Sequence, residues 1–334
     1  MTRYLKIAPF SLLALLIFAP LAPARTPGHA PKQDSQQPYG SAPSLEAGAT
    51  TVTTVVTVRG PKDTPPPPVD KRDVNVFTDK TRLNVTGWVP AQSTDQGALQ
   101  LAILIDNDVR SSILGQQVQD LANFINSLPP NAMVGVFYGQ YGAATVGAPF
   151  STDHKAVSEK LRLSEGNGGD SPSIYLSLAD LASKWQPAGP ARREVLVITS
   201  GIDTLHPGLQ DPYFDSTIDK VQRAGVEVYT IYDGSSRYGF SFGGETSQSK
   251  LIQVATETGG QSFMQGPTTP ISIAEYLNQL GSDFNHQYLL TFTTDPSKHA
   301  KGELRNIEVR LEQRDLKVSY PHAVFVPGKD LPKD

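Results

Sequence analysis

Between residues 99 and 128, a continuous apolar run is followed by an acidic loop and then by a helical pattern. Residues 101–105 are all apolar, which is typical of a strand buried on both faces of a parallel sheet. Asp106 comes directly after them, so its carboxylate is expected at the carboxyl end of the strand, where open α/β sheets bind ligands. From Leu114 to Leu128, apolar residues recur every three or four positions, which predicts an amphipathic helix that ends before Pro129.

Apolar strands and amphipathic helices continue to alternate through the middle of the chain. Strands are predicted at residues 133–138, 194–199, 226–232 and 261–264, with an antiparallel edge strand at 145–150. Helices are predicted at residues 154–163, from Ser171 onward, from Asp211 to Gly225, at about 248–258 and at 271–284. This alternation indicates an α/β fold with a doubly wound, mainly parallel, Rossmann-like sheet.

Segments with strand patterns lie on both sides of this region. Before it, strands are predicted at residues 51–58, 69–77 and 83–88, which together form a small β-module at 49–96. After it, strands are predicted at 287–292, 304–311 and 316–320. We expect residues 285–327 to pack on the β-module as a flanking unit, with 328–334 as a tail.

The N-terminus has the pattern of a secretory signal. Arg3 and Lys6 give a basic start, residues 7–21 are mostly apolar, and Ala22-Pro23-Ala24 offers small residues for cleavage. We therefore expect residues 1–24 to be a cleaved signal peptide, so that the mature chain is secreted or periplasmic and has no membrane span. An uncleaved anchor is the alternative. Residues 25–48 are rich in Pro, Gly, Ser and Gln, which predicts a disordered linker.

Composition narrows the classes of function. Of the 334 residues, 38% are hydrophobic and 19% are charged, as in a globular protein with a core. The net charge of −4, without a basic stripe, argues against a nucleic-acid partner. The absence of cysteine excludes disulfides and thiolate metal sites. No dinucleotide-binding, nucleophile-elbow or zinc-helix motif occurs, so no enzyme is expected; a hydrolase using Asp106 is the least favoured reading.

The strand and acidic loop resemble the first strand and metal loop of von Willebrand factor A (vWA) domains. The family pattern is Asp-x-Ser-x-Ser, and the matching positions here are Asp106, Asp108 and Arg110. Residues 195–204 resemble the family's strand with Asp-Gly, and residues 251–260 resemble its helix ending in Thr-Gly-Gly. The resemblance extends to the acidobacterial VWFA-related group and implies a vWA domain over residues 97–284.

The resemblance implies an incomplete oxygen-ligand site for Mg²⁺ that a partner's carboxylate completes. The matching ligands would be Asp106, Asp108, Ser171 and Ser200. Arg110 replaces a serine and Ser200 replaces an aspartate, so the site is expected to be degenerate, with no cofactor or only weakly bound Mg²⁺. Alternatively, Arg110 folds back on the carboxylates and takes the place of the cation.

The expected function is a secreted or periplasmic protein–protein binding module. Residues 233–247 are predicted to be a loop whose aromatic residues, set among glycines, can present apolar area to an unknown protein partner. The expected partner-binding residues are Arg110, Tyr238, Phe240 and Phe242. The alternative is a structural module of an envelope assembly whose ligand face is vestigial.

Overall fold

The computed structural model describes residues 49–61, 64–107, 115–163, 173–185, 192–203, 205–206, 211–234, 242–264 and 269–328. The chain divides into two compact units, and all of the described residues belong to the second, Pro43–Asp334. The expected signal peptide (1–24) and linker (25–48) lie outside the described residues. No helix in the described ranges combines the length and apolar character needed to cross a membrane.

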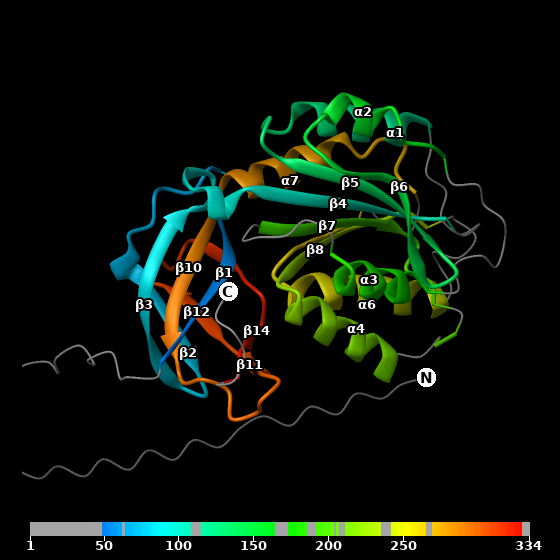
Figure 1. The fold of residues 1–334 in the computed structure, drawn as a ribbon. Helices are drawn as coiled ribbons and strands as arrows, with labels where there is room; N and C mark the ends of the chain where they lie inside the picture. Colours follow the sequence, from blue (N-terminus) through cyan, green and yellow to red (C-terminus); the bar gives the residue numbers. More distant parts are fainter. Residues whose placement is uncertain are drawn as a thin grey trace, which may run out of the picture. The chain divides into compact units, whose positions relative to one another are not determined.

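A six-stranded sheet forms the core of the α/β part (Figure 1). Its strands are β4 (Leu99–Asp106), β5 (Met133–Gln140), β6 (Ala143–Ser151), β7 (Arg192–Thr199), β8 (Val226–Tyr232) and β9 (Ser262–Phe263). Their order is β6-β5-β4-β7-β8-β9; β6 is antiparallel to β5 and all other pairs are parallel. Every residue of β4 is buried, as its apolar run predicts.

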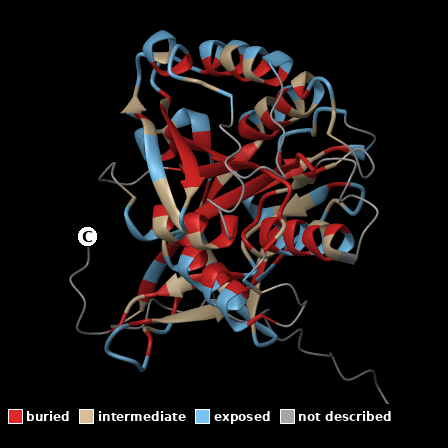
Figure 2. Cartoon of the chain, turned by 90° about the vertical axis from the view of Figure 1, so that its right-hand side faces the viewer, coloured by how far each residue is buried: buried red, intermediate tan, exposed pale blue. Residues whose placement is uncertain are grey.

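Helices cover both faces of this sheet (Figure 1). On one face lie α1 (Gly115–Ser127), α2 (His154–Ser158) and α7 (Ala274–Asn285); on the other lie α3 (Ile174–Ser183), α4 (Pro212–Arg223) and α6 (Phe242–Glu257). Successive residues of a strand face opposite sides, so Ile103 packs with Leu121 of α1 while Leu104 packs with Leu178 of α3. The helices bury one side and expose the other (Figure 2). The fold is mixed α/β with a largely parallel sheet.

A second six-stranded sheet combines strands from the two ends of the chain. It contains β1 (Thr50–Arg59), β2 (Val74–Thr78), β3 (Thr81–Pro90), β10 (Gln287–Thr294), β12 (Glu308–Leu311) and β13 (Lys317–Ser319), in the order β12-β2-β3-β10-β1-β13. All its pairs are antiparallel. Two more strands, β11 (Glu303–Asn306) and β14 (Ala323–Val326), pair with each other, and 3-10 turns lie at Lys71–Asp73, Ala91–Ser93 and Asp95–Gly97.

Buried polar side chains link the two sheets. Gln287 of β10 donates its amide to Glu194 Oε1 of β7 (2.9 Å) and Glu227 Oε2 of β8 (3.2 Å). Arg192 donates to Gln287 Oε1 (2.5 Å) and to the carbonyl of Phe284 (2.9 Å). The four polar or charged residues of this group, Arg192, Glu194, Glu227 and Gln287, are each at most 5% exposed. Burying polar groups costs free energy unless they find hydrogen-bond partners, and here each of these side chains makes at least one such bond.

The structure differs from the predicted elements at several places. The helix predicted at 154–163 ends at Ser158, and the first part of the strand predicted at 69–77 contains the 3-10 turn Lys71–Asp73. The predicted strand at 304–311 is two strands in different sheets, because Ile307 turns its N–H to the His322 carbonyl and buries its side chain. The predicted loop at 233–247 is shorter, since α6 already begins at Phe242. The strand β14 is not predicted; its four residues are too short a pattern to distinguish from a loop.

Candidate functional site

The carboxyl ends of β4 and β7 are joined by a short hydrogen-bond chain. The hydroxyl of Thr199 donates to Asp106 Oδ2 (2.5 Å) and accepts from the N–H of Gly201 (2.8 Å). Asp106 is only 2% exposed. Gly201 has φ +67°, and a Cβ there would lie 2.9 Å from Leu251 Cγ, so this turn requires glycine. The loop after β7 is therefore fixed against the end of β4.

Asp203 organises the next part of the same loop. Its Oδ2 accepts the hydroxyl of Ser173 (2.8 Å), and its Oδ1 accepts the N–H groups of Leu205 (2.9 Å) and His206 (3.0 Å). Tyr175 donates its hydroxyl to the carbonyl of Gly201 (3.2 Å), and burial raises the pKa of Tyr175 well above its usual value, so it remains a donor. The start of α3 and this loop thus hold each other in place.

A buried ion pair joins α6 to the start of α4 beside this loop. Lys250 of α6 donates to Asp211 Oδ2 and to the carbonyl of His206, both at 2.9 Å. Asp211 Oδ1 accepts the N–H groups of Tyr213 and Phe214 and so caps α4. Burial acts to raise the pKa of Asp211, but the hydrogen bond from Lys250 and those from the cap outweigh it, and the pKa lies below its usual value.

One cluster with metal-ligating atoms occurs within the described ranges: Asp203, His206 and Asp211, whose ligand atoms lie within 4.8 Å of one another. Both oxygens of Asp211 already accept hydrogen bonds, one of them from the ammonium of Lys250. A divalent cation would have to displace this ammonium or lie beside it, which like-charge repulsion disfavours. The cluster therefore suits an internal lysine better than a divalent metal.

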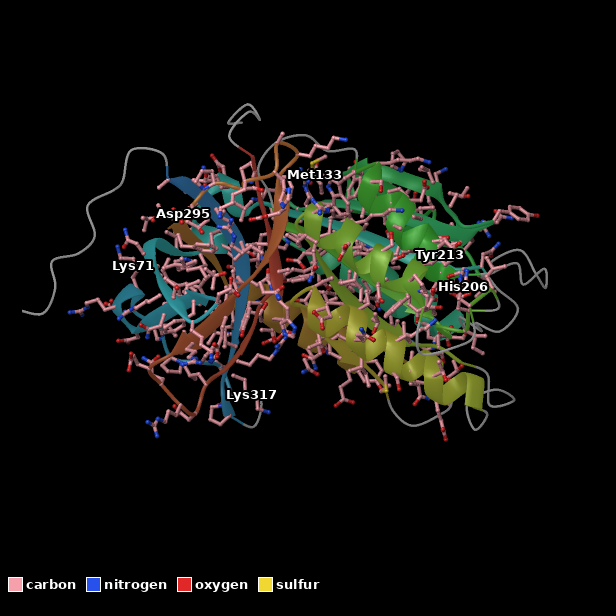
Figure 3. The ribbon with its side chains drawn as sticks, turned by 90° about the horizontal axis from the view of Figure 1, so that it is seen from below. Lys71, Met133, His206, Tyr213, Asp295 and Lys317 are labelled. Atoms are coloured by element: carbon pink, nitrogen blue, oxygen red, sulfur yellow. The ribbon has the colours of Figure 1, made fainter. Side chains whose placement is uncertain are left out.

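An apolar pocket of about 240 Å³ lies beside this cluster, lined by Gly201, Ile202, Asp203, His206, Gly243, Thr246, Ser247 and Lys250. Two large side chains of the neighbouring segments are exposed: Leu205 at 53% and Tyr213 at 59%. The Tyr213 ring stacks on His206, with ring centroids 4.4 Å apart (Figure 3). Sequence reasoning missed Leu205 as a surface group, although its position after a predicted strand was a usable signal.

The structure describes only part of the predicted site. Asp106 and Ser200 lie at the carboxyl ends of adjacent parallel strands, and Ser200 is buried and accepts the N–H of Ile202 (3.4 Å). The other predicted positions lie outside the described residues: Asp108, Arg110, Ser171, Tyr238 and Phe240. Phe242 is the first residue of α6 and not part of a loop, and its side chain is not described.

Comparison with known proteins gives structural likenesses only. No protein-family model matches the chain, and no curated protein matches it. Among solved structures, a von Willebrand factor type A structure from Catenulispora acidiphila matches with 11% identity and a TM-score of 0.42. The match covers 86% of this chain and 76% of that one. The SpRpn10 VWA domain matches with 16% identity and a TM-score of 0.37, over 55% of this chain and 95% of that one.

The conserved hypothetical protein BatB from Bacteroides thetaiotaomicron also matches, with 15% identity and a TM-score of 0.39, over 56% of this chain and 98% of that one. Two of these three structures are vWA domains by name, the family that the sequence resembles. The likenesses are consistent with a vWA-like domain. Because each of these TM-scores is below 0.5, the likenesses say nothing of function.

Proposed function

We propose that the chain is an exported protein-interaction module whose binding face is the carboxyl edge of the parallel sheet. The observation that carries the proposal is the exposed pair Leu205 and Tyr213 beside the small apolar pocket. Large apolar and aromatic side chains next to a pocket are typical anchors of protein interfaces. Asp203 and Asp211 hold the flanking backbone in place, so these anchors are presented by an ordered scaffold.

The topology supports this choice of edge. In chain order, the strands of the sheet run 3-2-1-4-5-6, with helices on both faces, which favours a doubly wound, Rossmann-like arrangement. Ligands of such sheets bind outside the carboxyl ends of the strands. In this proposal, residues 49–96 and 285–327 form a flanking β-module that carries the vWA-like unit of residues 97–284.

The proposed metal site is degenerate. Ser200 stands where the vWA resemblance implies a carboxylate, and Asp106 already accepts the hydroxyl of Thr199. Any Mg²⁺ held by Asp106, Asp108, Ser171 and Ser200 would therefore be weak, and the interaction is proposed not to depend on it. The buried, hydrogen-bonded state of Asp106 also disfavours its use as a nucleophile, which supports a binding role over hydrolysis.

A capture experiment tests the proposed face. The full chain is immobilised and exposed to the exported protein fraction of its source, with and without a chelator. We expect capture of a discrete partner in both conditions, and we expect Tyr213→Ser to abolish it because the substitution removes an interface anchor. The thermal midpoint should barely change, since exposed substitutions usually cost under about 0.5 kcal/mol.

Val146→Ser is the matched control, because Val146 of the edge strand β6 is 58% exposed, close to the 59% of Tyr213. It should capture the partner as well as the unmodified chain does. Undiminished capture by Tyr213→Ser would refute the proposed face. If the unmodified chain captures nothing, the alternative of a structural envelope module takes its place.

A further inference from the structure

A second cavity, of about 410 Å³, lies away from the carboxyl edge. It lies between the two sheets, near the amino ends of β7 and β8 and the C-terminal end of α4. We call it the seam cavity. Arg193, Arg223 and Glu227 line it from the α/β side, and Val52, Leu289 and Val324 line it from the second sheet and β14. Its volume is within the range of about 300–1,000 Å³ that is typical of small-molecule sites.

The charges of the seam cavity are unbalanced. The charged residues that line it are Arg193, Arg223 and Glu227. Two arginines outnumber the single carboxyl of Glu227, and burial, and then the neighbouring Glu194, raise the pKa of that carboxyl well above its usual value. The two arginines remain charged. The lining therefore carries a net positive charge that favours an anion.

Arg193 is the more firmly held of the two arginines at the cavity wall. Its Nη1 donates to the carbonyl of Ala224 (3.1 Å), which fixes the guanidinium at the end of α4. Its Nε is buried and has no acceptor among the described residues. Arg223 is exposed at the rim, with its guanidinium carbon 5.7 Å from the centre of the Phe325 ring. A guanidinium preferentially pairs with planar anions such as carboxylate.

The opposite wall is mostly apolar, with Thr53 and Thr54 of β1 as its polar members. Val52 and Val324 are buried members of the core of the second sheet, and Leu289 is 7% exposed. A ligand must therefore combine an anionic group with an apolar body. We propose that the seam cavity binds a small molecule that carries one carboxylate on an apolar body. This site is independent of the carboxyl-edge face.

Decanoate, used below its aggregation concentration, is the probe. Calorimetric titration of the full chain should give saturable binding with one site per chain, and the ligand should raise the thermal midpoint. Arg193→Gln should weaken binding about tenfold or more, because a charge-assisted hydrogen bond is lost. Arg223→Gln should weaken it as well; this second variant keeps the test valid if Arg193→Gln does not fold, since Arg223 is exposed.

Three controls separate charge from apolar contact. Decanol and decyltrimethylammonium should bind at least about tenfold more weakly than decanoate, since neither offers an anion to the arginines. Arg314→Gln, in the exposed loop between β12 and β13, should bind decanoate normally. Absence of saturable decanoate binding, equal binding of decanol, or unchanged binding by both cavity variants would overturn the proposal. None of these results bears on capture by the carboxyl edge.

Discussion

At the scale of single residues, Lys250 occupies the position in which a cation would balance the acidic groups of the site. Its side chain is 2% exposed, and that of its partner Asp211 is 1% exposed. The ammonium also lies 5.4 Å from the centre of the Phe214 ring and 5.7 Å from that of Tyr175, within range of cation–π attraction. The charge of Asp211 is thus compensated by the protein itself.

We expect Lys250→Met to destabilise the protein strongly. The substitution keeps the volume of the side chain but leaves the buried carboxylate of Asp211 without its partner, which costs about 3–5 kcal/mol in comparable cases. Urea unfolding measures the loss. The double variant Lys250→Met with Asp211→Asn should recover much of it, because asparagine still caps α4 without a charge. A loss below about 1 kcal/mol in the single variant would contradict this account.

The sequence predicts where single residues lie in the fold better than it predicts their hydrogen-bond partners. The rule that polar residues after buried strands gather at one sheet edge places Asp106 and Ser200 correctly at the ends of β4 and β7. It does not reveal that Ser173 bonds Asp203 or that Lys250 bonds Asp211, because these partners lie 30 and 39 residues apart and meet only through tertiary packing.

At the scale of elements, the junction of β7, β8 and β10 contains a pair of buried carboxyls. Glu194 and Glu227 share the amide of Gln287 as a hydrogen-bond donor, and each carboxyl keeps one buried oxygen without a partner among the described residues. Burial, only partly offset by Arg192 and Gln287, raises the pKa of Glu194 to about 8. Near the same junction, Arg59 of β1 forms a bidentate ion pair with Asp283 of α7 (2.7 and 2.8 Å).

This pair predicts that stability falls as pH rises. The folded chain holds the Glu194 proton up to about pH 8, whereas the unfolded chain releases it near its ordinary value of 4.5. Proton binding therefore favours the folded state fully below about pH 4.5, and the benefit is lost between there and about pH 8. Glu194→Gln should flatten this decline, as followed by urea unfolding at a series of pH values.

Glu312→Gln serves as the control, because Glu312 is exposed and lies outside the junction. It should leave the pH profile of the unfolding midpoint as it is in the unmodified chain. A Glu194→Gln profile that falls as steeply as that of the unmodified chain would show that the carboxyl pair does not set the pH dependence.

Elements were predictable wherever the burial pattern was long. The eight residues of β4 are uniformly buried and read as a central strand, and Asp211-Pro212 gives both the cap and the first turn of α4. The pattern failed at 304–311, because one continuous segment supplies strands to two different sheets. It also placed the start of α6 too late, because Gly243 and Gly244 are poor helix formers and their presence predicts a loop.

At the scale of the whole molecule, the proposed export predicts the mature N-terminus. A basic start, an apolar stretch and Ala22-Pro23-Ala24 favour cleavage after Ala24. Intact-mass measurement of the exported protein should therefore correspond to a chain that begins at Arg25. Recovery of a chain that begins at Met1, or its retention in the membrane fraction, would contradict the proposal.

The pairing of β3 with β10 determines how the molecule transmits mechanical load. Pro90, at the end of β3, lies opposite Tyr288, at the start of β10, so the whole α/β part leaves and re-enters the second sheet between two paired strands. Tension applied between residues 49 and 328 is then borne by the strand pairs that hold these two points, β1 with β10 and β13, and β14 with β11. The carboxyl-edge face stays outside this load path until β3 and β10 separate.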